Sequence, residues 1–110
     1  VFSLMAVDYV PDEAALDNLL TDDPLVVIDF TASWCGPCKL VAPLMDQLSE
    51  QYNGQITVAK LDIDANKPIA KRFSIKSIPA VLFFKGGEHV DTVIGAKPYG
   101  EFVAALDKHL

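Results

Sequence analysis

Residues 25–40 read LVVIDFTASWCGPCKL, a stretch that joins an apolar run to both cysteines of the chain. The run from Leu25 to Phe30 is β-branched or apolar on both faces, with Asp29 as its one charged residue. Such a strand is typical of the centre of a sheet that helices cover on each side. We therefore expect Leu25–Phe30 to be a central strand and the cysteines to follow it directly.

The sequence after Trp34 changes to a helical period and ends at Asn53-Gly54, where glycine can adopt a positive φ. The apolar residues that recur at intervals of three and four are Val41, Leu44, Met45, Leu48 and Tyr52. This pattern predicts a long helix whose first turn contains Cys35 and Cys38.

The rest of the chain alternates between the two periods. We expect a helix between a cap at Asp12 and a stop at Asp22-Asp23-Pro24, a strand over 56–62, and a short helix over 69–73. Strands over 80–84 and 89–94 are close enough only for an antiparallel hairpin, and a last helix covers 99–110. The sequence thus predicts an α/β fold with a mixed sheet, helices on both faces, and one domain over 1–110.

Composition excludes several classes of function. The 110 residues carry 9 basic and 15 acidic side chains, a net charge of −6, and the basic residues are dispersed, so no nucleic-acid partner is expected. No window approaches the roughly 20 apolar residues that cross a bilayer, and Val1–Val10 lacks the basic start of a signal peptide. We expect no membrane partner.

Cys35 and Cys38 have the spacing of a reversible disulfide. Residues three apart on a helix lie about 5–6 Å apart, which is within the range of a disulfide. Free N–H groups at a helix start stabilise a thiolate, so Cys35 is predicted to be the nucleophile. Cys38, further into the helix, is predicted to be the resolving thiol that attacks a mixed disulfide.

Other interpretations of the two cysteines are weaker. A structural disulfide across so short a loop would constrain the unfolded chain little, although this alternative stays open, as does a chance pair of buried cysteines. A zinc site needs four ligands, and His89 and His109 lie far apart, so no metal is expected. Lys39 stands where haem attachment requires a histidine.

Asp29 also requires an explanation, because a carboxylate inside an apolar strand is costly unless it is paired, hydrated or protonated. We predict that it lies beneath the dithiol, that burial raises its pKa, and that it accepts the proton of Cys38. Lys60, on the neighbouring strand, is a candidate counter-ion. The alternatives are a hydrogen-bonded structural acid for Asp29 and a surface lysine for Lys60.

Two further positions are suggestive on local evidence alone. Pro79 opens a strand, where proline is tolerated, and the Ile78-Pro79 bond is a candidate for the cis form. Gly95 marks either a simple turn or a close approach of two backbone segments.

Taken together, Asp29-Phe30, Trp34 to Lys39, Ile78-Pro79 and Gly95-Ala96 resemble the thioredoxin family over essentially the whole chain. The resemblance implies a five-stranded mixed sheet flanked by four helices, and reduction of disulfides in other proteins. It also implies that Cys35 attacks, Cys38 resolves, Asp29 assists proton transfer beside Lys60, and Pro79 is cis and faces the dithiol. The apolar patch that the resemblance assigns to target docking comprises Trp34, Gly36, Pro37, Ile78, Pro79, Gly95 and Ala96.

The same resemblance implies the partners. They are disulfide-containing target proteins and a thioredoxin reductase, dependent on NADPH or on ferredoxin, that regenerates a monomeric protein without a bound cofactor. The Gly36-Pro37 dipeptide lacks the histidine of related oxidants and isomerases, which favours a reductant. An oxidant or isomerase on this scaffold, and a redox-independent assembly subunit, remain the alternatives.

Thr31 departs from many bacterial thioredoxins, which have a second tryptophan there, and resembles some plant and algal forms. The compartment is expected to be the cytoplasm or an organelle interior such as the plastid stroma, where thiols are kept reduced.

Overall fold

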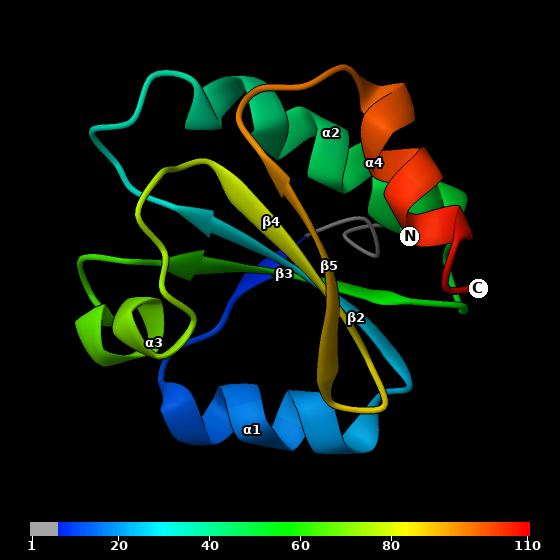
Figure 1. The fold of residues 1–110 in the computed structure, drawn as a ribbon, viewed down its shortest axis with the longest axis horizontal. Coiled ribbons are helices and arrows are strands. Elements are labelled where there is room, and N and C mark those ends of the chain that lie inside the picture. Colours follow the sequence, from blue (N-terminus) through cyan, green and yellow to red (C-terminus); the bar gives the residue numbers. More distant parts are fainter. Residues whose placement is uncertain (1–6) are drawn as a thin grey trace.

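The computed structural model describes residues 7–110, which form one sheet between two pairs of helices (Figure 1). The sheet order is β1-β3-β2-β4-β5. In chain order the elements are β1 (Asp8–Tyr9), α1 (Glu13–Asp22), β2 (Leu25–Thr31), α2 (Cys38–Gln51), β3 (Thr57–Asp62), α3 (Lys67–Arg72), β4 (Ala80–Lys85), β5 (Glu88–Ile94) and α4 (Tyr99–Asp107).

The strand β2 is central, as its apolar sequence predicts. It runs parallel to β3 on one side and antiparallel to β4 on the other, while β1 extends the sheet parallel to β3 and β5 pairs antiparallel with β4. In this register Asp29 lies opposite Lys60 on β3 and opposite Val81 on β4. The sheet is therefore mixed and places both charged residues at neighbouring positions.

The sheet has a separate apolar core on each face. Val27 of β2 packs with Met45 of α2 and Phe102 of α4, whereas Ile28 packs with Leu16 of α1 and Ile69 of α3. Figure 1 shows α2 and α4 above the sheet and α1 and α3 below it. Because side chains alternate along a strand, Asp29 shares the α2 and α4 face with Val27.

The structure differs from the sequence prediction mainly at the ends of elements. The strand β1 has no counterpart in the periodicity, because two residues carry no detectable alternation. The β4–β5 connection is tighter than expected: Lys85 pairs with Glu88, and Gly86 and Gly87 have φ values of 59° and 82°. The helix α4 ends at Asp107, three residues before the end that the apolar spacing suggested.

The helices also bear on membrane association. Within residues 7–110, none is long and apolar enough to cross a bilayer.

Candidate active site

The dithiol pair lies where β2 ends and α2 begins. After β2 the chain crosses a short loop, Pro37 takes the N-cap position, and Cys38 is the first residue of α2. The sequence analysis predicted that Cys35 lies in the first turn of the helix. This prediction is wrong, because Cys35 lies in the loop, three residues before α2 begins. This placement still directs the first N–H groups of α2 toward Cys35.

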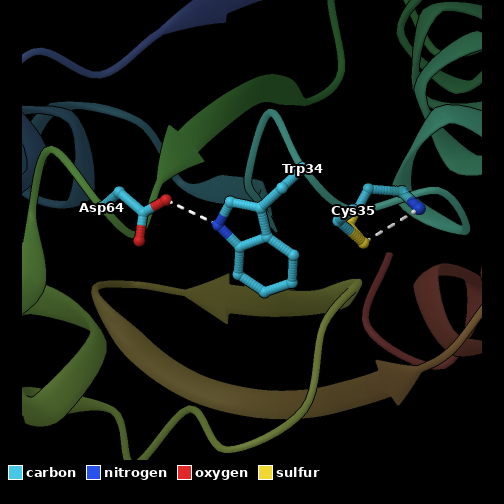
Figure 2. Close-up of a disulfide and its surroundings, with 4 residues drawn as sticks. Trp34, Cys35 and Asp64 are labelled. Carbon is cyan, nitrogen blue, oxygen red and sulfur yellow. Dashed lines mark hydrogen bonds between the residues drawn. A yellow bond between two sulfur atoms is a disulfide. The ribbon is translucent and has the colours of Figure 1, made fainter.

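Cys35 and Cys38 form a disulfide, with 5.4 Å between their Cα atoms. The backbone N–H of Cys38 donates a hydrogen bond to Cys35 Sγ at 3.2 Å (Figure 2). Both residues are buried, and they pack against Ala32 and against the half-buried Ile63 and Ile78. The helix start thus offers a backbone donor to the sulfur that was predicted to be the nucleophile.

Asp29 is buried in β2, on the face of the sheet that α2 covers. It is 1% exposed, and its Oδ1 has no hydrogen-bond partner among the described residues. A cavity of about 190 Å³ is lined by Asp29, Cys38 and Lys60 together, and it has room for water. Burial raises the pKa of the Asp29 carboxyl from 3.8 to about 7, and the charge of Lys60 partly opposes that rise.

Lys60 is half-buried at the rim of the same cavity. Its Nζ lies 4.7 Å from the centre of the exposed Tyr9 ring, a cation–π contact that fixes the direction of the side chain. The structure therefore brings Lys60 close enough to act electrostatically on Asp29, without a hydrogen bond between them. Tyr9 was missed by the sequence analysis, since it lies on the undetected strand β1.

Trp34 lies on the surface beside the disulfide. It is 67% exposed, and its indole Nε1 donates a hydrogen bond to Asp64 Oδ2 at 2.7 Å (Figure 2). Asp64 is a second residue that the sequence analysis missed. The signal was present, because Asp64 follows the predicted strand 56–62 and the ends of neighbouring parallel strands meet at one edge of a sheet.

The loop before β4 closes the other side of the site. The Ile78-Pro79 peptide bond is cis, and the side chain of Ile78 contacts the buried cysteine cluster. The N–H of Gly95, which has a φ of 95°, donates to the carbonyl of Pro79 at 2.8 Å. Gly95 therefore marks a close approach between two loops, and the Pro79 carbonyl already accepts one hydrogen bond.

Of the remaining predicted docking residues, two lie between the cysteines in the sequence and the third follows Gly95 directly. Gly36, Pro37 and Ala96 are exposed, and a Cβ on Gly36 would meet no atom within 4 Å. The described residues contain no group of three or more histidine, cysteine or acidic side chains placed to bind a metal ion.

A buried disulfide at a helix start, above a buried carboxyl and beside a cis proline, defines a class: proteins that exchange dithiols for disulfides. The family model described as Thioredoxin matches residues 7–108. The chain belongs to the thioredoxin family, and it is a protein-disulfide oxidoreductase with a Cys-x-x-Cys redox centre at Cys35 and Cys38.

Individual relatives agree with this assignment. The chain is 42% identical to Thioredoxin 1 of Nostoc sp., an alignment that covers 97% of this chain and 100% of that one. It is 44% identical to the chloroplastic M-type thioredoxin of Spinacia oleracea over 92% of this chain and 56% of that one. A solved structure of Plasmodium falciparum thioredoxin, 32% identical, superposes with a TM-score of 0.88 over 94% of this chain and 100% of that one.

Proposed function

We propose that the protein is a general reductant of protein disulfides, in which Cys35 attacks and Cys38 resolves. The Cys35 thiolate forms a bond to one sulfur of the target disulfide, and the other target sulfur leaves as a thiol after taking up a proton. Cys38 then loses its proton and attacks Cys35 Sγ, which releases the second target thiol and leaves the Cys35–Cys38 disulfide. Two electrons pass to the target in each cycle.

One observation carries this assignment of roles: the Cys38 N–H donates to Cys35 Sγ at the start of α2. A thiolate on Cys35 keeps that donor and also faces the positive end of the helix dipole, whereas no described residue donates a hydrogen bond to Cys38 Sγ. The thiolate is therefore more stable on Cys35, which makes it the attacking sulfur.

We assign proton acceptance from Cys38 to Asp29. Both residues line the same cavity, and a carboxyl with a pKa of about 7 changes its protonation state within the working range of the reaction. Lys60 lies at the rim of that cavity and favours the ionised carboxylate.

The docking patch that we assign is Trp34, Gly36, Pro37, Ile78, Pro79, Gly95 and Ala96. An extended target segment beside Cys35 would pair with the backbone of Ile78, since Gly95 already occupies the Pro79 carbonyl. Exposed Trp34 would cover one side of that segment.

We further propose that the protein acts as a monomer and that a thioredoxin reductase, linked to NADPH or to ferredoxin, returns electrons to the disulfide. The relatives named above include a cyanobacterial and a chloroplastic protein. We therefore place this protein in the cytoplasm or in the plastid stroma.

Reduction of insulin with dithiothreitol as the electron source tests the proposal. Cys35→Ser is expected to lose the activity, and Cys38→Ser is expected to accumulate a mixed disulfide with the target. A Cys35→Ser protein as active as the parent would contradict the assignment. The reduction potential then separates the reductant from the oxidant alternative, since a value near that of periplasmic oxidants, about −120 mV, would reverse the direction.

A further inference from the structure

A groove beside the redox centre is not used by the function proposed above. It has a volume of about 520 Å³ and follows α3 and the segments on each side of it. Three exposed lysines and three half-buried apolar residues define what we call the lysine groove: Lys67, Lys71, Lys76, Ile63, Ala70 and Ile75.

The lysine groove shares a wall with the redox centre. Ile63 lines the groove and also packs against the cluster that contains Cys35 and Cys38. Asp64 stands at the same end of the groove and holds the indole of Trp34, as Figure 2 shows. The groove and the redox centre therefore adjoin each other.

The lysines of the groove are free to act on a partner. No ion pair within residues 7–110 involves Lys67, Lys71 or Lys76, whereas the neighbouring Arg72 is held by Glu13 and Asp17 at 2.9 Å each. Residues 1–6, VFSLMA, contain no acidic side chain. The one carboxylate at the groove, on Asp64, already accepts from Trp34.

This concentration of positive charge contrasts with the rest of the molecule. The chain has a net charge of −6, so its average field repels an acidic partner. The three lysines of the groove form no ion pair within the described chain, and the groove adjoins the disulfide through Ile63. An acidic segment is therefore attracted to the same side of the molecule on which the reaction takes place.

We propose that the lysine groove binds an acidic segment of the target polypeptide, next to the disulfide that Cys35 attacks. The inference rests on the proposed reductase function and adds a substrate preference to it. The lysines receive Asp or Glu side chains, and the floor of Ile63, Ala70 and Ile75 receives an apolar side chain of the same segment. The apolar floor and the length of the groove favour a peptide over a small anion.

Two synthetic peptides test this preference. Both contain the same intramolecular disulfide, and they differ only in whether the flanking residues are Glu or Gln. At low ionic strength the parent protein is expected to reduce the Glu peptide about three- to tenfold more efficiently in kcat/KM, the range that two or three exposed ion pairs provide. Addition of 0.5 M NaCl is expected to remove the difference by screening, since the Debye length there is only about 4 Å.

The decisive variant is Lys67→Gln/Lys71→Gln, with Lys85→Gln/Lys108→Gln as a control of equal charge change away from the groove. The groove variant is expected to lose the preference for the Glu peptide and to reduce the Gln peptide at the parental rate. The control is expected to keep the preference. Reduction of the Gln peptide also shows that each variant is folded.

The outcomes separate this inference from the proposed function. If neither peptide is reduced, the reductase function itself is wrong. If both peptides are reduced equally well, or if the control variant loses the preference as strongly as the groove variant, the groove does not bind acidic segments. If inorganic phosphate removes the preference and chloride of equal ionic strength does not, the groove is a small-anion site and the peptide proposal is wrong.

Discussion

Asp29 is the residue in which the needs of folding and of catalysis conflict. Its carboxyl is buried on the central strand, where only the cavity shared with Cys38 and Lys60 relieves its desolvation. A buried unpaired carboxylate costs several kcal/mol, so an apolar residue would make a more stable strand. The cavity that Asp29 shares with Cys38 suits the proton acceptance that we propose for this acid, and two predictions follow from its pKa.

The first prediction concerns the resolving step. Asp29→Asn removes the proton acceptor, so release of the mixed disulfide is expected to slow by about ten- to a hundredfold at pH 7. The parental rate should rise as pH passes through the Asp29 pKa of about 7, and the variant should lack that rise. The difference should shrink above about pH 8.5, where a thiol ionises unaided.

Rapid-mixing measurement of thiol release from a preformed mixed disulfide checks this prediction. Asp46→Asn, at an exposed position on α2, is the matched control and should follow the parental profile. Equal rates for parent and Asp29→Asn between pH 6 and 9 would remove Asp29 from the mechanism.

The second prediction concerns stability. The Asp29 pKa is raised from 3.8 in the unfolded chain to about 7 in the folded one, so below pH 3.8 both states are protonated and the parent is not penalised. Between pH 3.8 and about 7 the unfolded chain releases this proton while the folded protein retains it, so the parent loses stability across that interval, and the loss levels off above about pH 7 where both states are ionised. Asp29→Asn has no such group, so its advantage over the parent should grow by about 2–4 kcal/mol between pH 4 and pH 8.

Urea unfolding of the oxidised proteins across this pH range measures the advantage. The Asp46→Asn control should show no comparable trend. A difference between parent and Asp29→Asn that is independent of pH would mean that Asp29 does not titrate in this way.

At the scale of elements, the sequence pattern predicted all four helices and four of the five strands, because their apolar residues recur at helical or strand spacing between turn residues. Asp29, Cys35 and Cys38 could be predicted to meet, since a short loop connects a central strand directly to a helix. The place of Asp64 at the same end of the sheet could also have been predicted from the strand over 56–62, whereas its hydrogen bond to Trp34 and the contact of Ile63 with the cysteines depend on how two loops pack. The cis form of Ile78-Pro79 was open on local sequence and depends on tertiary context.

The β4–β5 turn gives an element-scale prediction. Gly87 has a φ of 82°, and a Cβ there would lie 3.3 Å from the carbonyl oxygen of Leu20 in α1. Gly87→Ala is therefore expected to lower the free energy of unfolding by about 1–2 kcal/mol, through the unfavourable backbone conformation and that contact. Gly100→Ala is the control, because Gly100 lies in α4 with open space around its Cα and should gain up to about 1 kcal/mol.

Thermal or urea unfolding of the two variants distinguishes the positions. Insulin reduction should be unchanged in both at 25 °C, because neither glycine belongs to the docking patch or lines the cavity that holds Asp29 and Cys38. Equal stability of the parent and Gly87→Ala would mean that the turn tolerates a side chain there.

On the scale of the whole molecule, the described residues form a nearly isometric body, 30 × 30 × 29 Å, with its chemistry at one edge of the sheet (Figure 1). The carboxyl ends of β2 and β3 lead to the cysteine loop and to α3, while the β4–β5 turn and the end of α1 lie at the opposite edge. Two continuous apolar cores hold this arrangement together. We therefore expect the fold to persist when the disulfide is reduced.

This independence can be tested by reduction of the protein. The disulfide closes a loop of only four residues, for which chain entropy predicts about 2 kcal/mol of stabilisation. Urea unfolding with and without dithiothreitol should differ by no more than that amount, and Cys35→Ala/Cys38→Ala should be insensitive to the reagent. Complete unfolding of the parent on reduction would show that the cross-link is structural.

Trp34 gives the molecule one more property. It is the single tryptophan of the chain, it is open to solvent, and it lies next to the sulfur atoms that change bonding in each cycle. Its ultraviolet emission is therefore an intrinsic optical signal of the oxidation state, and a bound target that covers the indole would shift the emission wavelength. The progress of the reaction can thus be followed in unlabelled protein.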